Sequence, residues 1–329
     1  MLLAVVPPWV TASIDHRGLE DLEEIELDLG RPPRLHFCDR DDAVTASGEV
    51  SRQDLQYVLG RVTRFREDNR TGIDRTLHRI ACIRDRYHEI IGFTFRVGRA
   101  VEEAAQPLRD LLEARRSILV VGRPGAGKTT VLRSAASILS GQLRRRVVIA
   151  DTSNEIGGDG QIPHPAIGSA RRLQIPLPDP ARPTDGGVRQ AAVILQAVIN
   201  HRAETIIVDE VGFAADARIA RTIARRGIQL IATAHGASLQ DIVFNAELAC
   251  LAGDVHTVVL SPEEIARRGV ERHTTLERAG PPVFDCAIEI ARRGTYVIHP
   301  DVARSVDSLL NGVPPRTLIR ETSPSAATR

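Results

Sequence analysis

Gly122-Arg-Pro-Gly-Ala-Gly-Lys-Thr129 is the stretch that decides the fold of this chain. It matches the pattern G-x-x-x-x-G-K-[ST], in which glycines let backbone N–H groups turn toward phosphate oxygens. From amino-acid composition alone, a chance match to this pattern is expected in roughly one chain in a hundred. The residues expected to contact phosphates are Gly122, Arg123, Pro124, Gly125, Ala126, Gly127, Lys128, Thr129 and Thr130. The pattern predicts a phosphate-binding loop for ATP between a buried strand and a helix.

Two side chains of this loop carry the expected chemistry. Lys128 is the single lysine among 43 lysine and arginine residues, and it stands where a compact ammonium would meet the γ-phosphate of ATP. Thr129 offers a hydroxyl to Mg²⁺, which keeps several waters and needs few protein ligands. The helix that begins here points its positive end at the phosphates.

Alternating strands and helices surround the loop. We expect buried strands at 117–121, 147–150, 205–208 and 229–233, with helices running to about residue 139, over 188–200 and over 214–226. This alternation predicts an α/β fold, a RecA-like P-loop NTPase core with a parallel sheet.

The order of expected strands and helices divides the chain into three regions. Residues 1–104 read as a small α+β domain, with a helix capped by Ser51 and Asp54 and a hairpin over 77–85 and 89–99. Residues 105–312 read as the RecA-like P-loop ATPase domain with a C-terminal extension. Residues 313–329 are expected to be a disordered tail, and their last stretch, 322–329, is small and polar.

A second motif lies about 80 residues beyond the loop. Thr205-Ile-Ile-Val-Asp209-Glu210 is an apolar strand that ends in two acids, a Walker-B pattern. Asp209 is expected to hold Mg²⁺ through water, and Glu210 to orient or deprotonate the attacking water. The alternative is a strand that simply ends in solvated acids.

Further polar residues follow neighbouring strands. In a parallel sheet the carboxyl ends of the strands share one crevice, so Asp151 and Glu155 could reach Mg²⁺ or the lytic water. His235 at the end of the next strand could sense the γ-phosphate. The alternatives are a capping role for Asp151 and a structural role for His235.

Arginines are candidates for completing the site from a neighbouring subunit. Residues 155–187 form a long Gly/Pro-rich stretch, which we interpret as a functional loop carrying Arg171 and Arg172. Arg172 is our first choice for an arginine finger and Arg99 the second, with Arg96 on the same expected hairpin. In a chain this rich in arginine, each could equally be a surface charge.

The amino-acid composition argues against several other classes of protein. The net charge is +1 and aromatic residues make up 3% of the chain, which gives little support for nucleic-acid binding. No apolar run approaches the roughly 20 residues of a membrane-spanning helix. Four cysteines without C-x-x-C spacing indicate reduced thiols, so we expect a cytoplasmic protein.

Together these motifs resemble one family, the stage III sporulation protein AA-like ATPases with their plastid and cyanobacterial relatives, within the secretion-type (type II/IV traffic) ATPases. The likeness runs from Glu26 to about Gly312. Its most specific stretches are 68–79, 96–100, 151–160, 162–168 and 232–236. The resemblance implies a homo-hexameric ring, with an Asp box at Asp151 and Glu155 and a His box at His235.

Two departures qualify the resemblance. Traffic ATPases usually carry Gly where this chain has Asp209. Some relatives add a C-terminal module for single-stranded nucleic acid with an R-x-x-x-H signature, whereas the only such spacing here, Arg84 to His88, lies in the expected N-terminal hairpin. Nucleic-acid binding is therefore not carried over.

Three functions remain open at this point. The first is an oligomeric ring motor that couples ATP hydrolysis to the movement of a protein or filament partner. The second is a nucleic-acid motor acting on single-stranded or branched DNA. The third is a nucleotide-dependent switch with negligible turnover, which Glu210 next to Asp209 disfavours.

Overall fold

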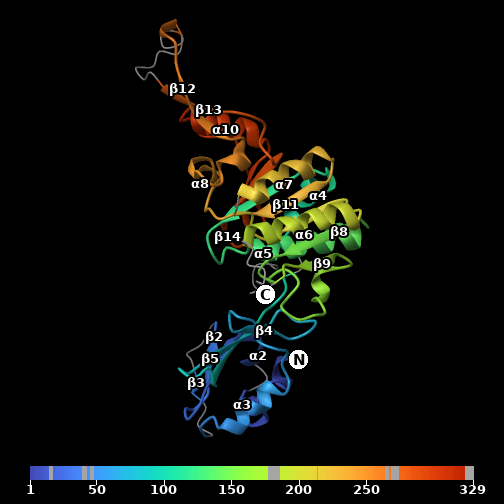
Figure 1. The fold of residues 1–329 in the computed structure, drawn as a ribbon, viewed down its shortest axis with the longest axis vertical. Helices are drawn as coiled ribbons and strands as arrows, with labels where there is room; N and C mark the ends of the chain where they lie inside the picture. The colour runs from blue at the N-terminus through green and yellow to red at the C-terminus, as the bar shows by residue number, and fades with distance from the viewer. Residues whose placement is uncertain are drawn as a thin grey trace. The chain divides into compact units, whose positions relative to one another are not determined.

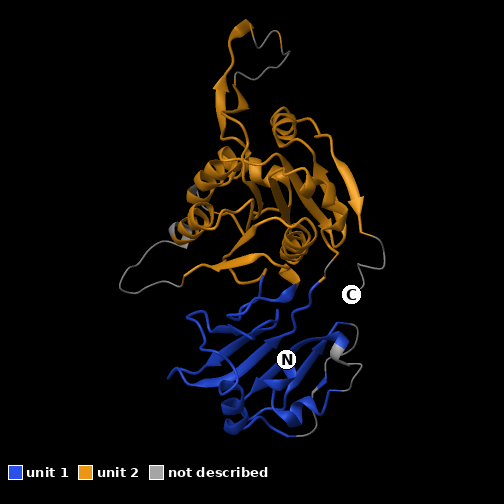
Figure 2. Cartoon of the chain, turned by 90° about the vertical axis from the view of Figure 1, so that its right-hand side faces the viewer, with its two compact units in different colours: residues 1–100, 157–165 blue, residues 101–156, 166–329 orange. Residues whose placement is uncertain are grey.

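The computed structural model describes residues 1–329 except 15–17, 39–42, 45–47, 102, 177–185, 213, 264–266, 268–273 and 323–329. The chain divides into two compact units, coloured separately in Figure 2. Unit 1 comprises residues 1–100 and 157–165, and unit 2 comprises residues 101–156 and 166–329. The segment 157–165 therefore belongs to unit 1, although it follows the strand that ends at Asp151 in unit 2.

Unit 1 is built on a six-stranded antiparallel sheet with the order β3-β2-β1-β6-β5-β4. Its strands are β1 Leu22–Asp28, β2 Arg34–Phe37, β3 Ala43–Val44, β4 Arg70–Gly72, β5 Arg79–Arg84 and β6 Ile90–Arg96. Its helices are the short 3₁₀ turn Leu2–Ala4, α1 Pro8–Thr11, α2 Gly18–Asp21 and α3 Arg52–Leu59. The expected hairpin is confirmed as β5 and β6.

Alternation along the strands gives unit 1 its core. Phe93 and Phe95 on β6 are fully buried, and Leu55 and Val58 on α3 join the same apolar cluster. The start of α3 is the expected capping box, since Asp54 N–H donates to the Ser51 hydroxyl and the Asp54 carboxylate accepts from Ser51 N–H.

The segment 157–165 packs tightly within unit 1. Arg66 Nη2 donates to Asp159 Oδ2 at 2.9 Å, and Asp159 is almost fully buried. A Cβ on Gly72 would lie 2.3 Å from the Asp159 Cβ, so only glycine permits this approach. The segment is thus fixed by close backbone contact as well as by charge.

Unit 2 is an eight-stranded sheet covered on both faces (Figure 1). The order β16-β15-β14-β7-β11-β10-β8-β9 contains six parallel strands, and β15 and β16 are added antiparallel at one edge. The strands are β7 Ile118–Gly122, β8 Val147–Asp151, β9 Arg171–Gln174, β10 Thr205–Val208, β11 Gln229–Thr233, β14 Cys286–Arg292, β15 Thr295–His299 and β16 Leu318–Glu321. The predicted α/β core with a parallel sheet, preceded by a smaller α+β domain, is confirmed.

The strands of this sheet are apolar on both faces because helices cover both. One face packs against α6 and α7 and the other against α4 and α5. The helices are α4 Arg109–Glu113, α5 Lys128–Ser137, α6 Gly186–Asn200, α7 Ala214–Arg225, α8 Leu239–Phe244 and α10 Val302–Leu310, with short 3₁₀ turns at Gln106–Leu108, Pro165–Ile167 and Ala249–Ala252 and a π turn at Ile138–Gln142. A separate hairpin, β12 Val255–Val259 with β13 Thr274–Arg278, completes unit 2. Among the described residues, no helix is both long enough and apolar enough to cross a membrane.

Two sequence-based expectations are wrong. The stretch 155–187 is not one loop, because Arg171–Gln174 forms the parallel edge strand β9 beside β8. The expected tail 313–329 is not disordered throughout, because Leu318–Glu321 pairs with β15 and Arg320 donates to the Asp110 carboxylate. Both are charged edge strands, whose composition resembles that of loops. Residues 323–329 lie outside the described part.

Candidate active site

Three neighbouring strands of unit 2 end at one level, and the adjacent strand β7 runs two residues further. In the register of the sheet, Val208 on β10 lies beside Ala150 on β8 and Ala232 on β11. The next residues, Asp151, Asp209 and Thr233, therefore emerge side by side at the carboxyl edge. The phosphate-loop motif begins at Gly122, the last residue of β7. The sheet thus gathers the predicted residues at the crevice where such folds bind ligands.

The loop 122–129 has the shape of an anion cradle. Gly125 and Gly127 adopt φ of +75° and +101°, and a Cβ added to either would meet nothing within 4 Å. No side chain caps the helix α5, which begins at Lys128. Its first N–H groups therefore face the open side of the loop, and together with the helix dipole they fit a phosphate.

The two polar side chains of the loop are held in place. Lys128 Nζ donates to the Gly122 carbonyl at 2.7 Å and to the Arg123 carbonyl at 3.3 Å. Thr129 Oγ1 donates to Glu155 Oε2 at 3.4 Å. The structure therefore brings the hydroxyl of the loop and the predicted acid of the segment after β8 together.

Asp209 is a buried carboxylate with hydroxyl partners. Its side chain accepts from Ser153 Oγ at 2.7 Å and from Thr233 Oγ1 at 3.3 Å. The pKa of Asp209 is raised to about 6, chiefly by burial and also by the nearby carboxylates of Asp151 and Glu155, against the lowering effect of the Ser153 hydrogen bond. A divalent cation bound near these acids would reduce their mutual repulsion.

Glu210 sits in a strained backbone conformation. Its φ is 62°, which a non-glycine residue adopts only when its surroundings enforce it. Its N–H donates to Thr233 Oγ1 at 2.8 Å, and its carboxylate contacts His235 Nε2. After His235, the Gly236 carbonyl accepts from Gly122 N–H at 2.8 Å. Glu210 and His235 therefore form an exposed pair anchored to the start of the loop.

A buried arginine connects the loop helix to the segment after β8. Arg133 on α5 is 6% exposed, and its guanidinium donates to the Ile156 carbonyl at 2.7 Å and to the Glu155 carbonyl. Asp151, fully buried, accepts from Ile156 N–H at 3.2 Å. Burial lowers the pKa of Arg133, and the Asp151 and Asp209 carboxylates oppose this. Arg133 thus balances the buried acids and fixes the backbone that carries Glu155.

The first-choice arginine lies on the edge strand. Arg172 on β9 stands opposite Ile149 of β8, and Arg171 Nη1 lies 3.3 Å from His201 Nδ1. These residues belong to a regular strand, so the free loop on which we expected them does not exist at this point.

The other candidate arginines lie in unit 1. Arg99 Nη2 donates to the Glu20 and Leu22 carbonyls at 2.6 and 2.7 Å. Arg96 Nε lies 3.0 Å from Glu24 Oε2. Both guanidinium groups are engaged within unit 1.

Sequence reasoning missed four residues that support the site. Thr233 and Ser153 hold the Asp209 carboxylate, and Gln190 Nε2 on α6 donates to the Glu210 carbonyl at 2.9 Å. Arg133 could have been noticed as a charge within the buried stripe of α5, between Leu132 and Ala135. The other three are ordinary polar residues whose roles depend on contacts distant in the chain.

Comparisons with known proteins add to this geometry. The chain is 37% identical over 311 residues to the uncharacterized protein ycf45 of Cyanidium caldarium, covering 94% of this chain and 90% of that protein. The chain belongs to the ycf45 family. Protein SEEDLING PLASTID DEVELOPMENT 1 of Arabidopsis thaliana is 45% identical over 94% of the chain and 44% of its own length. The chain spans about half the length of the first curated relatives that it matches, 44% and 54%.

More distant matches agree with the family resemblance that the sequence motifs indicate. Stage III sporulation protein AA of Bacillus subtilis is 24% identical over 68% of this chain and 76% of its own length. Among solved structures, the pilus retraction motor PilT with bound ADP matches at a TM-score of 0.51 and 14% identity, covering 83% of this chain and 82% of that one. The resemblance to sporulation protein AA and to the fold of secretion-type ATPases is confirmed. No family model matches the chain.

Proposed function

We propose that this ycf45-family chain is an ATP-hydrolysing motor. The observation that carries the proposal is the meeting of three elements at one sheet edge. These are the open glycine loop with Lys128, the Thr129–Glu155 contact, and the buried Asp209 next to strained Glu210. The fold likeness to a pilus retraction motor that binds ADP supports the nucleotide as the ligand.

The phosphate groups are assigned to the loop. Backbone N–H groups of Gly125 and of residues 127–130 would surround the β- and γ-phosphates, and Lys128 would exchange its carbonyl partners for phosphate oxygens. Thr129, Asp209 and Asp151 are the proposed residues for Mg²⁺. Bound Mg²⁺ would neutralise part of the negative charge of the phosphates. Asp209 would hold the cation through a bound water.

The attacking water is assigned to Glu210. Its carboxylate is half exposed at the carboxyl edge, and its backbone is held by Thr233, so it can accept a proton without moving the strand. His235 contacts that carboxylate and is the proposed sensor of the γ-phosphate. Glu155, beside the Thr129 hydroxyl, is the alternative base.

We further propose that the motor is a homo-hexameric ring whose sites are completed by Arg172 of a neighbouring subunit. The loose transition state of phosphoryl transfer spreads negative charge that one lysine leaves partly unbalanced, and an arginine in trans can contribute roughly 10³–10⁵ in rate. Arg172 lies two positions before Gln174, which pairs with Asp151, so the edge strand runs toward the site.

A mixing experiment tests the ring and the arginine together. Lys128→Ala and Arg172→Ala proteins should each be inactive, and mixing them should restore part of the ATPase activity, because some interfaces combine both intact residues. Arg304→Ala, an exposed arginine on α10, is the matched control for the loss of charge. Full activity of Arg172→Ala alone, or a strict monomer by mass photometry with a slowly hydrolysed ATP analogue, would contradict this proposal.

The object moved is proposed to be a protein or filament, within a reducing compartment such as the cytoplasm. All four cysteines are free thiols, and Cys82 and Cys286 are buried. ATPase rates measured with candidate protein fractions, single-stranded DNA and duplex DNA test the class of partner. Stimulation by DNA alone, lost steeply as salt rises, would instead indicate a nucleic-acid motor.

A further inference from the structure

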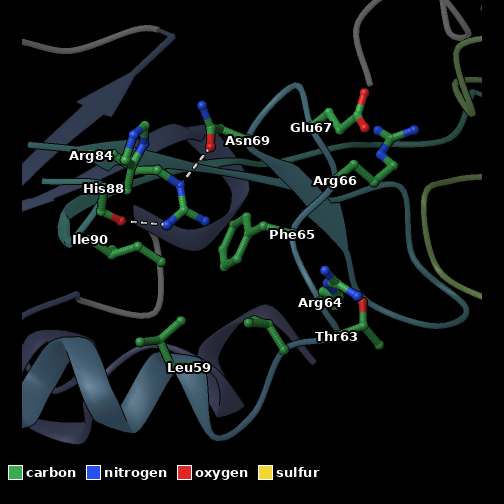
Figure 3. Close-up of a pocket in the computed structure, with 11 residues that line it drawn as sticks. Leu59, Thr63, Arg64, Phe65, Arg66, Glu67, Asn69, Arg84, His88 and Ile90 are labelled. Carbon is green, nitrogen blue, oxygen red and sulfur yellow. Dashed lines mark hydrogen bonds between the residues drawn. The ribbon is translucent and has the colours of Figure 1, made fainter. Parts of the chain in front are cut away.

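Unit 1 carries a cavity that the proposed ATPase chemistry does not use. Its volume is about 810 Å³, and it lies between the end of α3, the stretch 62–69 and the turn that joins β5 to β6 (Figure 3). Binding pockets for small ligands and peptide side chains commonly measure ~300–1,000 Å³. The cavity contains both members of the Arg84-x-x-x-His88 spacing that the sequence singled out.

One side of the cavity is apolar. Leu59 at the end of α3 is 39% exposed, and Val62 and Ile90 lie nearby. The Phe65 ring is stacked on Phe93 with 5.8 Å between ring centroids, so one of its faces is already covered. In Figure 3 the Phe65 ring and the Leu59 side chain point into the same space. These side chains therefore form an apolar patch within a lining that is otherwise polar.

The polar side of the cavity carries two arginines, Arg64 and Arg84, that form no ion pair among the described residues. Arg84 Nε donates to Asn69 Oδ1 and Arg84 Nη1 to the His88 carbonyl, each at 2.8 Å. Both acceptors are neutral, so they orient the guanidinium without cancelling its charge. Arg64 is also exposed, and among the described residues neither Arg64 nor Arg84 forms an ion pair with a carboxylate.

A neighbouring arginine shows the contrast. Arg66 lines the same cavity, but its Nη2 lies 2.9 Å from the buried Asp159 carboxylate. Glu67 is the one acid of the lining. Arg64 and Arg84 are therefore the groups that an external anion would meet.

We propose that this cavity binds an acidic peptide segment of a partner protein, with an aliphatic side chain of that segment seated between Leu59 and Phe65. The planar guanidinium fork of Arg84, held in place by Asn69, matches a carboxylate in two-point contact. The apolar side of the cavity accepts Leu or Ile of the partner. Nucleic acid fits less well, because base stacking favours open aromatic faces, and the rings in the described lining are Phe65, with one face covered, and the small imidazole of His88.

The site extends the proposed motor by giving it a docking point of defined chemistry, but its test does not depend on ATP hydrolysis. A random peptide library displayed on phage is selected against the full-length protein, with counter-selection against the Arg64→Glu/Arg84→Glu double variant. The expected consensus places Asp or Glu on either side of Leu or Ile. Synthetic peptides of that consensus are then titrated by fluorescence anisotropy.

Three variants and one control test the proposed contacts one at a time. Arg84→Glu and Arg64→Glu should each weaken peptide binding by about 10- to 100-fold, since each removes a charged hydrogen-bond donor. Leu59→Ser should weaken it by about 3- to 10-fold through the lost apolar contact. Arg86→Glu, an exposed arginine of the same turn that does not line the cavity, should change it less than twofold.

The outcomes separate the proposal from its rivals. Circular dichroism must show the same fold for all variants. Selected peptides without acidic residues, or affinities that Arg84→Glu and Arg86→Glu change equally, would overturn the proposal. Tight binding of a 12-nucleotide single strand that Arg84→Glu abolishes, with no acidic peptide selected, would also overturn it and assign the cavity to nucleic acid.

Discussion

Replacing Arg133 by Met should damage both stability and turnover, because this buried cation serves two groups at once. The change removes two hydrogen bonds to the backbone carbonyls of Glu155 and Ile156, in a position that is 6% exposed. A buried carbonyl left without a donor costs ~1–3 kcal/mol. The change also removes a positive charge that interacts with the buried Asp151 carboxylate, and leaving a buried charge uncompensated costs up to ~3–5 kcal/mol. Because these costs overlap, we expect a loss of about 3–5 kcal/mol.

Turnover should fall for a separate reason. Arg133 holds the backbone on both sides of the Glu155–Ile156 bond, and Glu155 contacts the hydroxyl of Thr129. Misplacement by about 1 Å can cost on the order of 10² in rate. Arg133→Lys keeps the charge but not the two-pronged geometry, so it should recover stability better than turnover.

Urea unfolding followed by circular dichroism measures the first effect, and steady-state phosphate release measures the second. Arg304→Met, at an arginine whose side chain is 89% exposed, is the control and should change stability by less than ~0.5 kcal/mol. If Arg133→Met unfolds at the wild-type urea concentration and keeps the wild-type kcat, the assignment of Arg133 as a positioning residue is wrong.

Three further predictions address other parts of the account. Glu210→Gln should keep ATP bound and reduce hydrolysis by about 10²–10⁴, measured by single-turnover phosphate release; an unchanged rate would make Glu155 the base. Gly72→Ala places a Cβ 2.3 Å from the Asp159 Cβ, so it should displace the segment 157–165 and speed its proteolysis, whereas Gly60→Ala, with no atom closer than 3.5 Å, should not. Asp209→Asn should stabilise the nucleotide-free protein at pH 8 by up to about 3 kcal/mol, because ionising the buried carboxylate costs free energy as the pH rises from about 4 through its raised pKa of about 6. The gain should vanish near pH 4 in urea titrations, and a gain that does not depend on pH would exclude this cause.

The parts of the site that the sequence predicts are those encoded locally. The glycine spacing of 122–129 dictates its own backbone, and the apolar run before Asp209 specifies a buried strand whatever surrounds it. Since parallel strands end at one edge, the meeting of Asp151, Asp209 and His235 follows from topology alone.

The missed parts depend on partners distant in sequence. Arg171–Gln174 has the composition of a loop, and only hydrogen bonds to β8 make it a strand. Leu318–Glu321 likewise becomes a strand by adding to β15. The role of Arg133 depends on two carbonyls more than 20 residues away, and its own neighbours in sequence suggest only an amphipathic helix.

The placement of 157–165 could not be deduced either. This short segment is rich in glycine, which favours a flexible loop in any local reading. Its position in unit 1 rests on Gly72, whose missing side chain makes room for Asp159, and on the ion pair of Asp159 with Arg66. A missing side chain that makes room for a distant residue leaves no periodic pattern in the sequence around Gly72 or around Asp159.

The most direct test of the central claim is phosphate release from ATP with Mg²⁺, measured for the wild-type chain and for Lys128→Ala in parallel. The account predicts steady release by the wild type, its loss when Mg²⁺ is removed, and no release above background by Lys128→Ala, which should also fail to bind ATP in calorimetry. His256→Ala, an exposed position on β12, should behave as the wild type. Equal phosphate release by the wild type and Lys128→Ala, or a wild type that binds no ATP, would contradict the assignment of this chain as an ATPase.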